Sequence, residues 1–477
     1  MPHSARSDVV ASRYASSQMV EVFSPERRIR LWRELWLAIA EAQHELGLPI
    51  SKAQIAELQK YVHKINWDVA ERREREMRHE VMAHVYAYGL QCKKAAGIIH
   101  LGCTSSYVMD NADLIMIKDG LHLIVGKLAS AIDRLGSFAE RERSTVTTAY
   151  THFQPAQPTT VGRRGCIWLA NLVMDLSRLE FELANLKFHG CKGATGTEDS
   201  YLKLFEGDRA KVRLLEKLVT RKMGFDDIYP VTGQTYPRKV DTHVVGVLAG
   251  ICESAAKFAT DVRLLQALHE VSEPMEETQI GSSAMPYKHN PMRTERIVSL
   301  ARYVMNLLKN CYDTASNQWF ERTLDDSANR RLTIPQAFLI TDGILDLTVD
   351  VVLGLRVRHA VIEQNLSREL PFLQTEEILM AAAREGGDRQ QLHERIRKHA
   401  KEVIKLVREK GQANDLLARL RKDPAFRSVP PKLLVRTDPK RLTGLATEQV
   451  EDFLRDTIEP IRRKYRTQLK NQPQIRV

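Results

Sequence analysis

The sequence predicts an almost wholly α-helical protein, with three helical domains arranged around a central bundle of long helices. Apolar residues recur at alternating steps of three and four along two long stretches, whereas the alternation typical of strands is sparse. The chain has 477 residues and a hydrophobic content of 43%, so it can bury a large core. Its length suits about three domains.

The first predicted domain covers residues 1–104 and contains a helix with clear start and stop signals. Ser24 is a typical N-cap residue, Pro25 suits the first turn, and Gly47 suits the end of the helix. The apolar stripe between these signals consists of Trp32, Leu35, Trp36 and Ile39. These residues predict a helix that packs one face into a core.

The central domain is expected over residues 105–357 and is defined by two apolar seams. The first seam consists of Leu114, Ile117, Leu121, Ile124, Leu128, Ala131, Leu135 and Phe138. The second consists of Leu169, Leu172, Leu176, Leu179, Leu183 and Leu186. They predict two helices of about thirty residues that pack side by side at a shallow angle. Residues 358–477 are expected to form a C-terminal helical domain.

The formal net charge of +11 allows a nucleic acid, a membrane surface or a small anionic substrate as partner. Basic and acidic residues are interleaved, as in residues 71–76, which favours solvated helix faces and argues against the first two partners. No apolar run reaches the roughly 18 residues of a membrane span. The start of the chain has no apolar signal core, which predicts a cytoplasmic protein. The six scattered cysteines predict reduced, buried thiols and no metal site.

The most informative polar segment spans residues 281–291 and reads GSSAMPYKHNP. Gly281, Pro286 and Pro291 oppose a continuous helix. The side chains that can hydrogen-bond to an anionic ligand or pair with it are Ser282, Ser283, Lys288 and Asn290. The pattern predicts a mobile loop that binds an anion.

Further polar islands interrupt the predicted helices. Thr104 and Ser105 suit a helix cap, and the same backbone N–H groups would also hold a carboxylate. His152 lies in a proline-rich polar loop, where structural and functional roles stay equally open. Arg78 and His79 occur on a charged helix, where surface decoration is favoured.

Two islands remain. Arg322, Ser327 and Arg331 suit a phosphate monoester, with surface ion pairs as the alternative. The glycine-rich residues 189–197 lack the order of a P-loop and indicate a flexible turn.

Taken together, these motifs resemble a known family. The loop at residues 281–291 resembles the signature loop of the fumarase/aspartase/argininosuccinate lyase superfamily, and its Ala-Met-Pro-Tyr-Lys core is most similar to that of the adenylosuccinate lyase family. Similar residues follow in the family's order over nearly the whole chain: Arg13-Tyr14, Arg78-His79, Thr104-Ser105, Thr151-His152, Gln234 and residues 318–331. His289 and Glu80 depart from the pattern, where Arg and Asp are more typical.

The resemblance implies a β-elimination that releases fumarate from two nucleotides. Adenylosuccinate would give AMP, and succinylaminoimidazole carboxamide ribotide (SAICAR) would give AICAR, with no metal or organic cofactor. Ser282 would remove the Cβ proton, with Ser283 as the alternative base, and His152 would protonate the departing nitrogen. The carbanion that forms needs cationic and hydrogen-bonding support.

The resemblance also assigns substrate contacts and an assembly. Carboxylate contacts would come from Lys288, Asn290, Thr104 and Ser105, and phosphate and ribose contacts from Arg13, Tyr14, Arg322, Ser327 and Arg331. Further contacts would come from Gln234, Arg296, Arg78, His79 and Glu80, and Glu295 would orient a histidine. The bundle helices are expected to form the core of a homotetramer whose active sites each draw on three subunits.

Two alternative functions are open. Argininosuccinate lyase would share the signature loop but has no use for a phosphate cradle formed by Arg322, Ser327 and Arg331. A non-catalytic basic helical scaffold would explain the charge and helicity, but not the combination of Ser282, Lys288 and His152.

Overall fold

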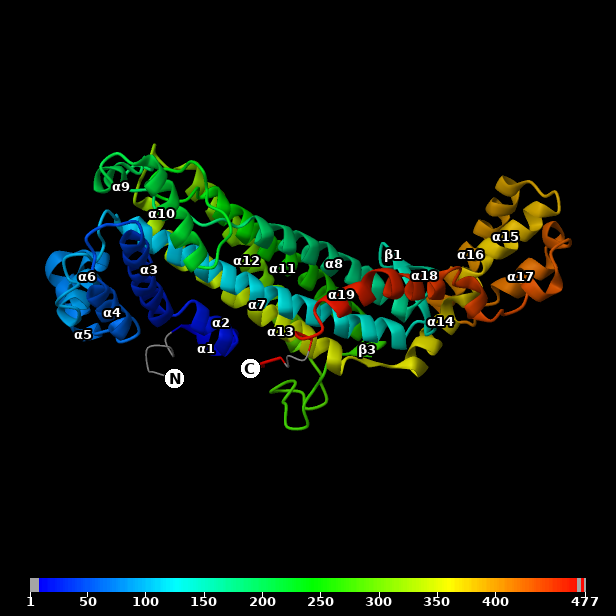
Figure 1. Ribbon diagram of the computed structural model, residues 1–477. Helices are drawn as coiled ribbons and strands as arrows, with labels where there is room; N and C mark the ends of the chain where they lie inside the picture. Colours follow the sequence, from blue (N-terminus) through cyan, green and yellow to red (C-terminus); the bar gives the residue numbers. More distant parts are fainter. Residues whose placement is uncertain (1–7, 470–472, 476–477) are drawn as a thin grey trace.

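The computed structural model describes residues 8–469 and 473–475 and confirms the all-α prediction. The molecule is elongated, with most of the N-terminal helices at one end, a bundle of long helices in the middle and most of the C-terminal helices at the other end (Figure 1). The N-terminal helices are α1 (Val9–Arg13), α2 (Ser17–Val22), α3 (Pro25–Glu45), α4 (Lys52–Tyr61), α5 (Trp67–Met77) and α6 (Glu80–Gln91).

Helix α3 begins and packs as its sequence predicts. The hydroxyl of Ser24 accepts a hydrogen bond from the backbone N–H of Arg27 at 3.1 Å, which caps the helix. The predicted stripe of α3 is fully buried, in a core shared with Val212, Leu215 and Val219. The short helices beside it are α9 (Asp199–Leu204) and α10 (Arg209–Lys222).

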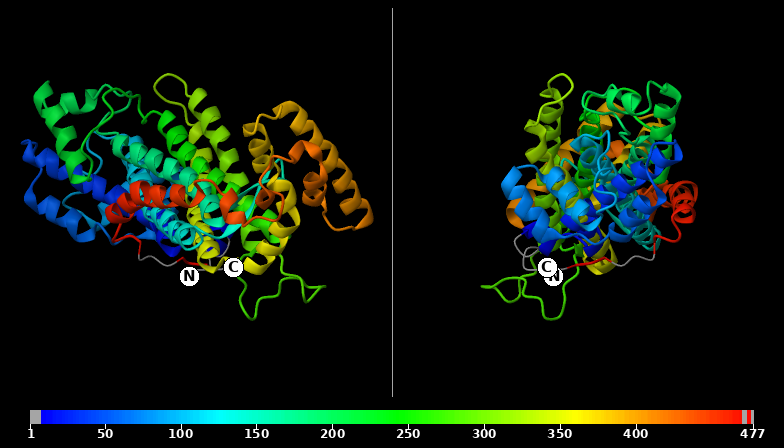
Figure 2. Two further views of the ribbon diagram at one scale, coloured as in Figure 1. Left: turned by 90° about the vertical axis from the view of Figure 1, so that its right-hand side faces the viewer. Right: turned by 60° about the vertical axis from the view of Figure 1, so that its left-hand side comes forward.

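The bundle consists of long helices that run alongside one another (Figures 1 and 2). They are α7 (Ser105–Arg141), α8 (Val161–Asn185), α11 (Lys239–Ala267), α12 (Met292–Ser316) and α13 (Asp325–Gly354). Both predicted seams lie on α7 and α8 and contribute to one large core, although Leu183 and Leu186 at the end of the second seam are only partly buried. The start of α7 belongs to the N-terminal core and the rest to the bundle core.

The expected proline-rich loop around His152 is instead a β-hairpin. Strand β1 (Val146–Thr151) pairs antiparallel with β2 (Gln154–Thr160), and a second small pair joins β3 (Val271–Ser272) to β4 (Arg356–Val357). The β-branched residues of β1 favour a strand. Pro155 and Pro158 are tolerated because a two-stranded sheet leaves each strand an edge that needs no donor.

The C-terminal part of the chain divides between two places. Its helices are α14 (His359–Leu373), α15 (Thr375–Arg384), α16 (Arg389–Lys410), α17 (Leu416–Lys422), α18 (Ala446–Phe453) and α19 (Glu459–Lys464). Short 3-10 turns occur at Pro424–Phe426, Pro431–Leu433 and Pro439–Leu442, and a π-helical turn at Leu454–Ile458. Helices α15 to α17 have their own core. By contrast, α18 and α19 return along the bundle (Figure 1), where Val450 and Ile458 join its core. The domain boundaries at residues 104 and 357 stay predictions.

Across residues 8–469 and 473–475, no helix combines the length and the apolar character that crossing a bilayer requires.

Candidate active site

One group of the predicted residues meets where α7 begins. Thr104 is the N-cap residue of α7, and no side chain caps the first turn. The backbone N–H groups of that turn, with the positive end of the helix dipole, suit a carboxylate. The hydroxyl of Ser105 lies 3.3 Å from His79 Nε2, while His79 Nδ1 accepts from the backbone N–H of Met82 and caps α6. Arg78 joins α5 to α6 and is exposed.

A cleft of about 340 Å³ begins about one turn further along α7, at Met109, and collects three more predicted residues. Glu80, Ser327 and Arg331 line it, and Arg331 forms an ion pair with Glu80. Other lining residues include Arg28, Trp67, His84, Asp113 and Arg330. The structure therefore joins the Arg78–Glu80 motif to the arginine-rich island, although about 250 residues separate them in the sequence.

A buried network of ion pairs holds the arginine-rich island in place, and sequence reasoning did not find it. Asp326 accepts from Arg322 and from Arg238, each at 2.7 Å. Arg238 also donates both terminal nitrogens to Asp110, at 3.0 and 3.2 Å. Arg238, Asp326 and Asp110 are each at least 95% buried. Burial favours the neutral carboxyl, but Arg238 and other neighbouring positive groups hold the pKa of Asp110 below its ordinary value.

Gln234 is fixed from two sides. Its amide nitrogen donates to the carbonyl of Ala194 at 3.0 Å, and its amide oxygen lies 3.4 Å from the hydroxyl of Ser106 on α7. Its backbone carbonyl accepts from His189 Nε2 at 3.1 Å. Burial lowers the pKa of His189 to about 4, so the ring is neutral at pH 7. Gln234 therefore contacts Ser106, which directly follows Ser105 in the first turn of α7.

Arg238→Met is expected to lower the free energy of unfolding by about 3–5 kcal/mol, because it leaves Asp110 and Asp326 buried without their shared cation. Denaturant unfolding at fixed protein concentration measures this loss. The matched control is Arg397→Met, which breaks an exposed pair with Glu394 and should cost less than about 1 kcal/mol. Equal losses in the two variants would show that the buried network has no special role.

His152 lies at the tip of the β1–β2 hairpin and is exposed. His152 and Phe153 form the two-residue turn, with φ angles of 53° and 55°. Positive φ at both positions is what a type I′ turn requires, and Gly or Asn usually provides it. Keeping two other residues there costs on the order of 1 kcal/mol each. This strain is retained at the one histidine that the sequence marked as a candidate acid, which supports a functional role.

The signature loop connects β3 to α12 and projects away from the bundle (Figures 1 and 2). Asn290 closes its base by donating to the carbonyl of Gly281 at 2.8 Å. A side chain at Gly281 would come within 2.3 Å of the carbonyl of Lys288, so the closure requires glycine. The hydroxyl of Ser282 accepts from the backbone N–H of Met285 at 3.2 Å, and Lys288 is exposed.

The residues that anchor this loop were not predicted. Glu273 is buried and accepts from the backbone N–H groups of Arg293 and Thr294 at 2.9 and 3.0 Å, which caps α12. Gln266 donates to the carbonyl of His289 at 3.0 Å and accepts from the backbone N–H of Glu273 at the same distance. Both ends of the loop are therefore fixed to the bundle.

Arg13, Tyr14 and Arg296 form a separate group. They line a narrow cleft in the middle of the bundle, together with Gly343 and Leu347 of α13. Gly343 is 12 positions beyond Arg331 on the same helix, which places the two groups about 18 Å apart along α13. Within one chain, Arg13 and Tyr14 therefore lie apart from the arginine-rich island that contains Arg331.

The hairpin of His152 is also far from the start of α7. Helix α7 has 37 residues, so its two ends lie about 55 Å apart. His152 lies eleven residues beyond Arg141, the last residue of α7, and a chain of that length could return by at most roughly 36 Å. Within one chain, His152 and Ser105 are therefore separated by at least about 18 Å.

Glu295 lies in the first turn of α12, where its carboxylate pairs with Arg263 at 3.8 Å. Its expected role in orienting a histidine stays a prediction. In the part of the chain that the structure describes, no three His, Cys, Asp or Glu side chains are grouped as metal ligands. The six cysteines are unpaired, and four of them are buried.

The chain belongs to a family of lyases. A family profile described as "Lyase" matches residues 16–306. Among solved structures, a fumarate lyase from Mesorhizobium sp. BNC1 has a TM-score of 0.79 at 24% identity, covering 93% of this chain and 99% of that one. The 3-carboxy-cis,cis-muconate lactonizing enzyme from Pseudomonas putida has a TM-score of 0.81 at 21% identity, covering 96% and 99%. These two structures share the fold.

Closer relatives specify the family. A second profile, described as "Adenylosuccinate lyase C-terminus", matches residues 371–453. The adenylosuccinate lyase of Schistosoma mansoni is 47% identical over 96% of both chains, and that of Schizosaccharomyces pombe is 47% identical over 93% of both. The chain belongs to the adenylosuccinate lyase family. It is an enzyme of the carbon–nitrogen lyase class.

Proposed function

We propose that this enzyme splits adenylosuccinate into AMP and fumarate, and SAICAR into AICAR and fumarate. The observation that carries the proposal is the cleft lined by Ser327 and Arg331, which begins about one turn beyond the N-terminus of α7, where there is no side-chain cap. An arginine fork and a hydroxyl suit a phosphate monoester, and the helix start suits a carboxylate. A substrate with both groups matches this end of the molecule, whereas argininosuccinate has no phosphate.

The proposed chemistry needs a base, an acid and cationic support. Ser282 takes the proton from Cβ of the succinyl group, and the electron pair left behind forms the double bond of fumarate as the C–N bond breaks. His152 gives a proton to the departing nitrogen. Lys288 and Asn290 stabilise the charge that builds on the substrate carboxylate. Serine is a weak base, so its alkoxide needs neighbouring positive charge, which Lys288 would supply.

The proposed substrate contacts come from several separate groups of residues in the chain. Arg322, Ser327, Arg331, Arg13 and Tyr14 hold the phosphate and ribose, and Thr104 and Ser105 hold a carboxylate. Gln234 and Arg296 contact the succinyl group or the base. Arg78, His79 and Glu80 complete the cleft, and Glu295 orients a histidine. No metal or organic cofactor takes part in these steps.

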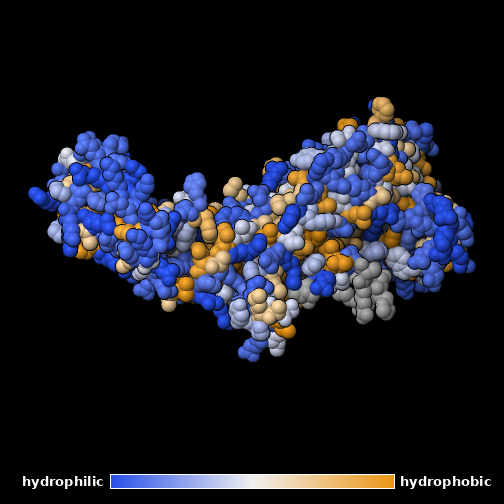
Figure 3. All heavy atoms as spheres, turned by 180° about the vertical axis from the view of Figure 1, so that it is seen from behind, coloured by the Kyte–Doolittle hydropathy of each residue, from blue (hydrophilic) through white to orange (hydrophobic). Residues whose placement is uncertain are grey.

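A homotetramer would bring the separated clusters together. The distance of at least about 18 Å between His152 and Ser105 supports a site that is shared between subunits. Exposed apolar residues on α8 support it further, because Ile167, Met174 and Phe181 recur every seven residues and are 47%, 70% and 55% exposed. Apolar residues also gather along the middle of one face of the molecule (Figure 3). These surfaces suit helices of further copies. A cytoplasmic location is part of the same proposal.

Arg331→Ala is expected to raise KM for adenylosuccinate by about tenfold or more while changing kcat little. A phosphate contact remote from the bond that breaks stabilises the bound substrate and the transition state alike. Steady-state kinetics separates the two constants. Arg408→Ala removes an exposed arginine from α16 and serves as the control. An unchanged KM in Arg331→Ala would refute the phosphate role.

The activity itself is tested with three substrates. We expect loss of adenylosuccinate absorbance with equal release of fumarate, the same release from SAICAR, and none from argininosuccinate. Turnover of argininosuccinate alone would favour the alternative lyase. No turnover of any of the three would contradict the proposed function.

A further inference from the structure

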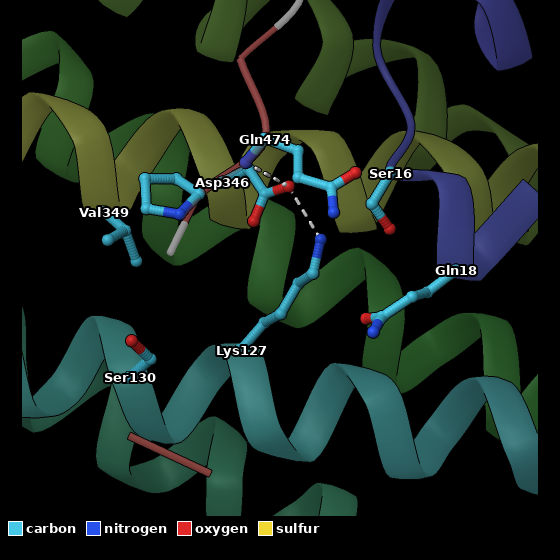
Figure 4. A pocket seen from close by; sticks show the side chains of 8 residues that line it. Ser16, Gln18, Lys127, Ser130, Asp346, Val349 and Gln474 are labelled. Atoms are coloured by element: carbon cyan, nitrogen blue, oxygen red, sulfur yellow. Dashed lines mark hydrogen bonds and ion pairs between the residues drawn. The ribbon is translucent and has the colours of Figure 1, made fainter. Parts of the chain in front are cut away.

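The described C-terminal segment, Pro473–Ile475, lies across the middle of the bundle beside the start of α2 (Figure 4). The side-chain oxygen of Gln474 accepts two hydrogen bonds from Ser17, one from the backbone N–H at 3.1 Å and one from the hydroxyl at 3.2 Å. A backbone N–H can only donate, so the amide of Gln474 must present its oxygen there. The C-terminal segment Pro473–Ile475 is thus hydrogen-bonded to the start of α2.

A buried ion-pair triad anchors both partners of this contact. Lys127 of α7 lies 2.6 Å from Asp342 and 2.7 Å from Asp346 of α13. Asp346 accepts from the backbone N–H of Gln474 at 3.3 Å, and Asp342 accepts from the backbone N–H of Ser16 at 2.7 Å. The C-terminal segment and the start of α2 are therefore bound to the same three charged side chains.

This arrangement fixes the residues just before Ser16. The backbone carbonyl of Tyr14 lies so close to α13 that a side chain at Gly343 would come within 2.5 Å of it. Gln474 and Ile475 line the narrow cleft together with Arg13, Tyr14 and Arg296. Helix α1, which ends at Arg13, has only five residues, and so short a helix depends on tertiary contacts for its position.

We propose that the C-terminal segment Pro473–Ile475 is a positioning element for nucleotide binding, which acts by holding Arg13 and Tyr14 against α13. The inference rests on the proposed function, in which Arg13 and Tyr14 contact the phosphate and ribose. Gln474 touches Ser17 and Asp346 rather than the reacting atoms, so its effect is on binding and not on the chemical step.

The test compares two substitutions of Gln474 in the full chain. Gln474→Leu keeps the volume but removes the acceptor, and it should raise KM for adenylosuccinate about tenfold with kcat unchanged. Gln474→Glu keeps an acceptor oxygen for Ser17 and should leave KM close to that of the unaltered enzyme. Gln474→Ala is expected to behave as Gln474→Leu, and it gives the same comparison if the leucine variant fails to fold.

A second readout is independent of activity. Hydrogen exchange of peptides covering residues 9–22 should become faster in Gln474→Leu and stay unchanged in Gln474→Glu, because only the first loses the bonds to Ser17. Unchanged KM in all variants of an active enzyme would overturn the inference, and so would equal rises in the leucine and glutamate variants. If the unaltered enzyme does not cleave adenylosuccinate, the proposed function fails. The exchange of residues 9–22 then decides alone whether the segment holds this part of the chain.

Discussion

Ser282→Ala is expected to fold and assemble normally while kcat falls by about 10² to 10⁴, the usual contribution of a positioned base. Ser282 lies in a loop outside the hydrophobic cores, and its hydroxyl accepts only a local hydrogen bond from Met285 among the bonds described for it. Its loss should therefore leave stability nearly unchanged. Steady-state kinetics and thermal unfolding, measured on the same preparation, separate the two effects.

The control for this prediction is the neighbouring hydroxyl. Ser283→Ala removes the same group one position away, where the side chain is exposed. We expect its kcat to stay within a few fold of the unaltered value, on the scale of a lost peripheral contact. If Ser283→Ala is the more damaging substitution, the base is Ser283 and the assignment is reversed.

The helical architecture was predictable because its signals are local. The two seams are spaced for helices, and residues near one another in the chain decide both the period and the cap at Ser24. The hairpin around His152 was missed for the same reason. Two prolines indicate a turn or loop when read locally, whereas the pairing partner, β1, is what makes Pro155 and Pro158 part of a strand.

The predicted flexible turn at residues 189–197 is wrong at its start. His189 and Gly190 are buried, and their backbone N–H groups donate to the side chain of Asn111 at 3.1 and 3.2 Å. Glycine adopts backbone conformations that other residues avoid, in ordered and flexible segments alike. The spacing of glycines therefore does not indicate whether a turn is ordered. The partner that fixes this turn lies about 80 residues earlier in the sequence.

The candidate site was likewise predictable only in part. Short motifs identified residues that can bind anions, and the structure joins Glu80 to Arg331 and His79 to Ser105. The ion-pair network that supports them was not predictable, because Asp110, Arg238 and Asp326 belong to three segments that are far apart in the chain. Contacts between subunits are still harder to predict from the sequence, because a sequence motif does not say which copy supplies its partner.

Two inactive variants are expected to restore activity to each other if the active site is shared between subunits. His152 lies at the hairpin tip and Ser282 in the projecting loop, and the two are proposed to come from different copies and to meet the substrate beside α7 of a third. His152→Ala and Ser282→Ala should each be nearly inactive alone. In an equal, randomly assembled mixture, about a quarter of the sites would receive both intact residues, given closed symmetric assembly.

The most direct test of this shared site is to denature the two variants together, refold the mixture and compare its kcat with that of each variant refolded alone. A site shared between subunits predicts recovery to about a quarter of the activity of the unaltered enzyme treated in the same way. Mixed oligomers are verified by a mass difference between the two variants. Mixed oligomers that show no more activity than the separate variants would mean that His152 and Ser282 act within one chain, and would contradict the proposed assembly.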